Sequence, residues 1–232
     1  MTSHPGSPKT IDFIITMLSH EQLHKEQQNS LASPPIRYGM LAKILFLTMD
    51  IVYGRKRTWN KFKILELIAR VPYQAWEHVA YIAITHSYHQ ADFARRIYER
   101  IQESRHQQDN EQWHLLILEE WIHRRGIREG FLRHRLIPQV IAFVYYHISW
   151  LLYVINPSLS YRLNMEFEDH AEREYMRFVQ EHPEFDREPF MSCFKQEFGN
   201  FDTMGDVLRQ IGFDERMHKE DSLKKIEQAR FT

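Results

Sequence analysis

The sequence has little cysteine, little glycine and no strong excess of either charge. Cys193 is the one cysteine among 232 residues, and a lone cysteine cannot form an internal disulfide. This excludes a disulfide-stapled domain and is typical of a reducing compartment. The formal charge of -1 and the lack of a groove-reading motif argue against a nucleic-acid partner. The length suits one substantial domain rather than two.

The N-terminal segment offers no recognisable targeting sequence. Its apolar run Ile11–Leu18 contains Asp12 and follows proline and serine rather than basic residues, so we predict neither a secretory signal nor a transit peptide. The break Ser33-Pro34-Pro35 predicts an N-terminal arm over residues 1–36, followed by a helical domain over residues 37–230.

Apolar residues recur at helical spacing and β-alternation is hard to find, so the sequence predicts an all-α fold. The expected helices are Tyr38–Val52, Trp59–His86, Asp92–His123, Arg135–Ile155, Ser158–Gln180 and Met204–Gln228. Most of Glu181–Thr203 lacks this pattern and is expected to be loop.

Two stretches, Tyr38–Val52 and Ile137–Ile155, are apolar enough to raise the question of a membrane. The second is nearly long enough to span a bilayer, but it contains Gln139 and His147, which are costly in hydrocarbon unless paired. We therefore predict two helices that lie in the plane of one leaflet. A basic cluster that follows the first of these two stretches suits either a solvated face or an anionic membrane surface. Its members are Arg55, Lys56, Arg57, Lys61 and Lys63.

The pattern Glu-x-x-His places a carboxylate and an imidazole one turn apart on a helix, where both can bind one metal ion. It occurs five times, starting at Glu21, Glu103, Glu111, Glu120 and Glu215. The pair at Glu111 leads into an apolar run, and the pair at Glu215 follows apolar residues at core spacing. Glu120 points to the opposite side of the helix from Glu111, and Glu103 lies in polar sequence. The pairs at Glu111 and Glu215 are therefore predicted to face the core.

A helix with one inward carboxylate followed by a helix with an inward pair occurs twice along the chain. The ordered set is Glu66, Glu111 with His114, Glu168, and Glu215 with His218. Ferritin-like di-iron bundles use this arrangement. Oxygen and imidazole ligands suit iron or manganese, and two divalent ions would neutralise four buried carboxylates. We therefore predict a ferritin-like four-helix bundle in which these six residues bind two iron ions.

Glu77 competes with Glu66 for the first position of this set. It comes eleven residues later, on nearly the same helical face but about 16 Å along the axis. Both glutamates therefore cannot bind the same pair of ions. The spacing alone leaves the choice between them open.

Four motifs resemble the alternative oxidase family, and its plastid terminal oxidase branch in particular. They are Leu65-Glu66-Leu67-Ile68-Ala69-Arg70, Asn110-Glu111-Gln112-Trp113-His114, Phe167-Glu168-Asp169-His170-Ala171 and Asp214-Glu215-Arg216-Met217-His218. The resemblance runs from about Asp50 to about Asp221 and implies that Glu66, not Glu77, is the iron ligand. It also implies a quinol oxidase that reduces oxygen to water without pumping protons.

The resemblance implies roles for residues beside the metal ligands. Tyr175 matches the family's tyrosine for oxygen chemistry, and Lys61, Leu65 and His170 match its quinol pocket. Lys61 stands where the family has arginine and Glu174 where it has threonine, so ubiquinol and plastoquinol both stay open as substrates. The family implies a homodimer bound to one leaflet, here of a bacterial cytoplasmic or thylakoid-type membrane.

Three alternatives remain at this point. A different di-iron enzyme, such as a hydroxylase, would have the same ligands, and a non-enzymatic iron-handling bundle would need neither a quinol pocket nor a membrane face. In addition, His20-Glu21-Gln22-Leu23-His24 is literally the zinc-protease motif. That motif lies near the N-terminus, and the sequence offers it no clear third ligand.

Overall fold

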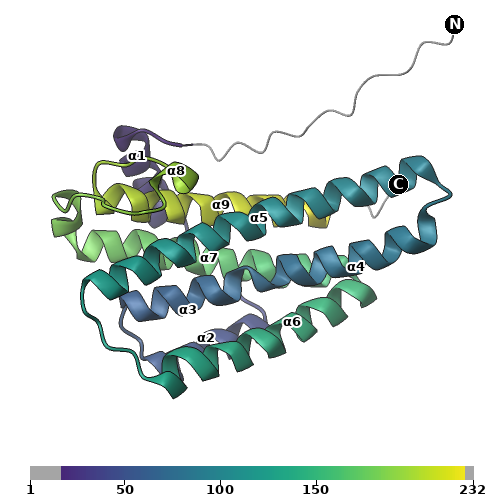
Figure 1. Cartoon of the computed structure of the whole chain (residues 1–232), viewed down its shortest axis with the longest axis horizontal. Coiled ribbons are helices and arrows are strands. Elements are labelled where there is room, and N and C mark those ends of the chain that lie inside the picture. Colours follow the sequence, from purple (N-terminus) through teal and green to yellow (C-terminus); the bar gives the residue numbers. More distant parts are fainter. Residues whose placement is uncertain (1–16, 228–232) are drawn as a thin grey trace, which may run out of the picture.

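The computed structural model describes residues 17–227, and within this range the chain forms helices and no β-strand (Figure 1). The prediction of an all-α fold is therefore confirmed. The helices that surround the bundle interior are α3 (Trp59–Ala69), α4 (Val71–Ser87), α5 (Ala91–Arg124), α7 (Pro157–Glu181) and α9 (Met204–Glu227). Helices α7 and α9 run side by side, and α5 runs along α3 and α4 (Figure 1). These two layers enclose the interior of a helical bundle.

The helix expected over Trp59–His86 is two helices, with a break at Arg70. The prediction of one continuous helix was wrong, because Pro72 has no backbone N–H and cannot continue the helical hydrogen bonding. The break falls one turn after Glu66, so this glutamate lies in the last turn of α3. Every residue of α3 except Asn60 is buried, which places Glu66 in the interior.

Helices α2 (Met40–Tyr53) and α6 (Ile137–Ile155) lie on one side of the bundle (Figure 1). A π-helical turn, η1 (Leu132–Leu136), leads into α6. The stretch Leu132–Ile155 is long and apolar enough to cross a membrane, and only 28% of its most apolar window is buried. Large apolar side chains are exposed on both helices: Met40, Leu41, Ile44, Leu47, Ile51, Val140, Phe143, Val144, Leu151, Val154 and Ile155. This side of the bundle therefore carries an uncovered apolar face.

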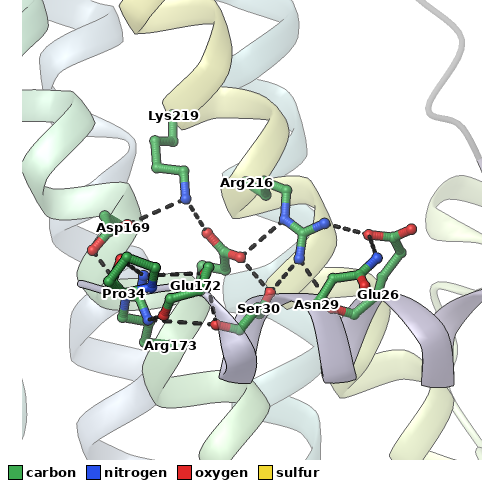
Figure 2. A network of polar contacts seen from close by, with 10 residues as sticks. Glu26, Asn29, Ser30, Pro34, Asp169, Glu172, Arg173, Arg216 and Lys219 are labelled. Carbon is green, nitrogen blue, oxygen red and sulfur yellow. Dashed lines mark hydrogen bonds and ion pairs between the residues drawn. The ribbon is translucent and has the colours of Figure 1, made fainter. Parts of the chain in front are cut away.

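Residues 20–32 form a helix, α1 (His20–Ala32), that the sequence did not lead us to expect. Figure 2 shows Arg216 of α9 joined to Glu26 and Ser30 of α1 and to Glu172 of α7. These contacts fix α1 against α7 and α9. The boundary proposed at residue 36 stays a prediction, and most of the apolar run Ile11–Leu18 lies outside the described residues.

The segment expected as loop after α7 contains two short helices, η2 (Pro183–Asp186) and α8 (Lys195–Phe198). Most of the remainder is irregular, as predicted. The segment nevertheless contributes four buried rings to the main apolar core, namely Phe185, Phe190, Phe198 and Phe201. Burial of these rings fixes the segment and closes the core beside α5, α7 and α9.

Candidate metal centre

The six predicted ligands come together in the interior of the bundle. Glu66 comes from α3, Glu168 from α7, and the two Glu-x-x-His pairs from α5 and α9. Five of the six side chains are fully buried, and His218 is 6% exposed. Within the described residues they form two groups whose ligand atoms lie within 4.8 Å of one another: Glu66, Glu111, His114 and Glu215, and Glu111, Glu168, Glu215 and His218. Because the groups share Glu111 and Glu215, these residues would hold two neighbouring ions.

Several carboxylate oxygens in this cluster have no hydrogen bond. Both oxygens of Glu215 and Oε2 of Glu168 are buried in this condition, whereas Oε1 of Glu111 lies 2.6 Å from Nδ1 of His218. Burying an uncompensated carboxylate costs several kcal/mol, whereas coordination by a cation satisfies its oxygens. Four carboxylates carry a formal charge of −4, which two divalent ions balance. The donor atoms therefore fit a pair of iron ions.

Burial sets the acid–base behaviour of the cluster. It raises the pKa of Glu66 to about 8, and together with repulsion from neighbouring carboxylates it raises the pKa of Glu168 and of Glu215 well above the usual range. For Glu111, His218 and His114 outweigh the effect of burial, so the pKa of this carboxyl is lowered. Without a bound cation Glu66, Glu168 and Glu215 thus favour the protonated form, and cation binding would displace those protons.

His114 is oriented by Asp214, a carboxylate that is not one of the six predicted ligands. Its Nε2 lies 3.2 Å from Oδ2 of Asp214, and its Nδ1 lies 3.2 Å from Oε2 of Glu66. With the proton on Nε2 donated to Asp214, the lone pair of Nδ1 points into the carboxylate cluster. Such a carboxylate–histidine contact fixes the ring of a metal-binding histidine. Asp214 had no predicted role, although it directly precedes Glu215.

Glu168 is held by a chain of hydrogen bonds. The Tyr73 hydroxyl donates to Oε1 of Glu168 at 2.8 Å. Nδ2 of Asn164 donates to the Tyr73 hydroxyl at 3.1 Å and to Oγ of Ser222 at 3.2 Å. This chain occupies one oxygen of Glu168 and leaves Oε2 free to face the other carboxylates. Tyr73 and Asn164 were also without a predicted role, because their contacts join distant helices.

Tyr175 lies directly beside the cluster. Its side chain is fully buried, and its hydroxyl donates a hydrogen bond to Oε1 of Glu66. Burial, followed by the charge of Glu66, raises the pKa of Tyr175 well above its usual value. The phenol is therefore held in its protonated form, with its proton directed at Glu66.

The rival glutamates lie elsewhere. Oε1 of Glu77 accepts a hydrogen bond from Nε of Arg105 at 2.7 Å, and Glu103 pairs with Arg100 at 3.0 Å. Glu120 accepts hydrogen bonds from Arg124, from Ser192 and from the backbone of Cys193. These glutamates are thus engaged by partners away from the six-residue cluster.

Comparison with known proteins decides the family. A family model described as alternative oxidase matches residues 16–224. The chain belongs to the alternative oxidase family. A curated relative, ubiquinol oxidase 4, chloroplastic/chromoplastic, from Arabidopsis thaliana, is 33% identical over 132 residues, which cover 56% of this chain and 34% of the relative. The resemblance drawn from the four motifs is confirmed at the level of the family.

The three residues matched to the family's quinol pocket have different contacts in the structure. Lys61 donates to Oδ1 of Asp50 at 2.6 Å and lines a cavity of about 450 Å³ that neither Leu65 nor His170 lines. Leu65 is buried in the apolar cluster that α3 shares with α2, α6 and α7. The His170 ring stacks on Phe46, with ring centroids 4.0 Å apart. Their role in quinol binding remains a prediction.

Glu174, the second departure from the family's pattern, has a defined partner. Its Oε1 accepts a hydrogen bond from Nη2 of Arg57 at 2.9 Å, and Arg57 also pairs with Glu181 at 2.6 Å. Arg57 lines the same cavity as Lys61. The carboxylate of Glu174 therefore compensates a basic residue at the wall of this cavity, which a threonine would not do.

Proposed function

We propose that this protein is a quinol oxidase that reduces oxygen to water at a di-iron centre held by Glu66, Glu111, His114, Glu168, Glu215 and His218. The observation that carries the proposal is the pair of ligand groups that share Glu111 and Glu215. Membership of the alternative oxidase family supports the same activity, as does the likeness to a protein named a ubiquinol oxidase.

The residues around the centre suit oxygen reduction. When bound, two iron(II) ions would supply two of the four electrons that the reduction of oxygen to water requires. Tyr175 can supply a third electron, because its hydroxyl already donates to Oε1 of Glu66 and the proton released on oxidation has an acceptor. Quinol would supply the fourth electron and then return the irons and the tyrosine to their reduced forms. The Phe198 ring lies 5.2 Å from the His114 ring and, with the surrounding apolar core, excludes water from the site.

Quinols dissolve in the bilayer, so the site must be reached from a membrane. We propose that α2 and α6 lie in the plane of one leaflet. The buried residues of α6 are Pro138, Ala142, Tyr145, Ser149 and Tyr153. These recur every three or four positions and face the bundle, while the opposite face exposes apolar side chains. A helix with one bundle-facing side and one apolar exposed side suits an in-plane position.

The family resemblance also supports a homodimer on a bacterial cytoplasmic or thylakoid-type membrane. The proposed substrate is ubiquinol or plastoquinol. Lys61 and Glu174 distinguish this chain from the family's usual pattern, so the choice between the two quinols stays open.

Oxygen uptake by the purified, iron-loaded protein tests this function. With a ubiquinol or plastoquinol analogue we expect uptake that depends on quinol, with two quinols oxidised for each oxygen molecule consumed. Glu215→Ala should abolish it. An iron-loaded protein that consumes no oxygen with either quinol would refute the proposal. Uptake that inserts oxygen into an organic substrate would indicate a hydroxylase instead, and oxidation of added iron(II) without quinol turnover would indicate an iron-handling protein.

A further inference from the structure

A second group of metal-ligating side chains lies where α1 meets the first turn of α9. His20, His24 and Asp206, here called the N-terminal triad, each place one ligand atom within 4.8 Å of the other two. Nδ1 of His20 lies 2.9 Å and 3.0 Å from the two carboxylate oxygens of Asp206. The His20 and His24 rings have centroids 4.4 Å apart. The triad shares no residue with the six-residue cluster.

The fold supplies the third ligand that the sequence motif lacked. His20 and His24 are the two histidines of His20-Glu21-Gln22-Leu23-His24, and their spacing of four residues puts both rings on one face of α1. The third ligand, Asp206, comes 186 residues after His20. It could not be recognised from the sequence, because only the packing of α1 on α9 brings it there.

We propose that the N-terminal triad binds one divalent transition-metal ion of the zinc class. Two imidazoles and one carboxylate are a common zinc ligand set, and three protein ligands leave the fourth position for water. Nε2 of His24 is buried and has no hydrogen-bond partner, which leaves an uncompensated polar atom at the site. Coordination through Nε2 would satisfy this atom.

The charges around the triad are compatible with a cation. Arg209 is the nearest competing positive charge, but its guanidinium pairs with both oxygens of Asp186, at 2.6 Å and 3.1 Å. It reaches Oδ1 of Asp206 only at 3.5 Å. Burial, and then the charge of Arg209, lowers the pKa of His24.

The position of α1 is already fixed without an ion. Figure 2 shows the contacts of Arg216 with Glu26 and Ser30, which tie the middle and the C-terminal half of α1 to α9. The triad joins the first turns of the same two helices. The ligands are therefore pre-organised, and a bound ion would fasten the start of α1 to the helix that carries Glu215 and His218.

The test is the zinc content of the full-length, iron-loaded protein after incubation with zinc chloride and removal of loosely bound metal. Iron is measured in the same samples, so that zinc that replaces iron at the six-residue cluster is counted separately. We expect one zinc ion per chain more in the wild type than in His20→Ala. The His20 side chain is 58% exposed, so this substitution should leave the fold and the iron content unchanged.

Three further variants make the comparison specific. Glu21→Gln changes the exposed neighbour of His20, and His123→Ala removes the histidine of another Glu-x-x-His pair; both should keep the additional zinc. Asp206→Asn should lose it, and cobalt(II) should give visible absorption bands of a four-coordinate site in the wild type that are absent in His20→Ala. Equal zinc content in the wild type and in His20→Ala would overturn the proposal, as would equal cobalt spectra.

Discussion

The hydroxyl of Tyr175 on α7 donates a hydrogen bond to Oε1 of Glu66 on α3, although 109 residues separate the two in the chain. The contact joins the proposed redox tyrosine directly to a proposed iron ligand. Helical spacing placed Tyr175 about 10 Å beyond Glu168 on the same face of one helix. Because of the contact with Glu66 across the bundle, the Tyr175 hydroxyl lies closer to the proposed metal centre than that spacing alone indicated.

We expect Tyr175→Phe to keep its fold and its iron but to lose nearly all quinol-dependent oxygen uptake. Phenylalanine conserves the buried ring, and loss of one hydrogen bond costs about 1 kcal/mol of unfolding free energy. The missing hydroxyl removes the electron and the proton that Tyr175 would provide. Iron analysis, thermal unfolding and an oxygen electrode measure the three quantities.

Tyr161→Phe is the matched control for that variant. Tyr161 is also a buried tyrosine, but its hydroxyl lies 3.1 Å from that of Tyr153 and not beside a carboxylate of the cluster. Its loss should lower stability by a similar amount and leave oxygen uptake near the wild-type rate. Near-normal uptake in Tyr175→Phe would contradict the role given to Tyr175.

Glu66 and Glu77 can be separated by a pair of identical substitutions. Glu66→Gln should reduce bound iron and activity together, because Glu66 lies in one of the two ligand groups. Glu77→Gln should leave both unchanged, because Glu77 pairs with Arg105 outside the cluster. Iron content per folded chain is the measurement, and the opposite pattern would exchange the roles of the two glutamates.

The sequence predicted the inward-facing ligands because helical periodicity determines which residues share a face. Glu111 with His114 and Glu215 with His218 were chosen from five similar pairs by the apolar residues around them. Periodicity could not choose between Glu66 and Glu77, since both lie on nearly the same face. That choice came from the family resemblance, and the structure places only Glu66 in the cluster.

Other features depend on contacts between distant parts of the chain and were missed for that reason. The orientation of His114 by Asp214 requires α5 to lie beside α9. Helix α1 was not predicted, because the proline break that follows it indicated an N-terminal arm. Ser19 and Gln22 nevertheless form a capping box that is visible in the sequence. The break at Arg70 was missed although Pro72 is visible in the sequence, because the apolar helical pattern continues through the proline.

Asp214→Asn tests the contact that orients His114. An amide can offer Nε2 either its oxygen or its nitrogen, so it holds the ring and its tautomer less firmly than the carboxylate does. We expect iron affinity to fall by roughly ten- to a hundredfold, as is typical when such an orienting partner is lost. Titration of the metal-free protein with iron(II) measures the change. Unaltered affinity in a folded variant would mean that Asp214 has no part in positioning His114.

The apolar face formed by α2 and α6 can be tested with lipid vesicles. The side chains of Ile51 and Phe143 are 74% and 65% exposed on this face. The double variant Ile51→Asp, Phe143→Asp should move the protein from the vesicle pellet to the supernatant, because charged groups are costly in the apolar layer. Tyr88→Asp, an equally exposed position at the end of α4, should sediment like the wild type. Wild-type protein that stays wholly in the supernatant would contradict the in-plane placement.

The number of iron ions bound by each folded chain tests the central claim most directly. The wild type should bind two, because two ligand groups share Glu111 and Glu215. Glu111→Ala removes a ligand from both groups and should lose bound iron while circular dichroism still reports a folded helical protein. Fewer than two irons in the fully loaded wild type, or two irons retained by a folded Glu111→Ala variant, would contradict the proposed di-iron centre.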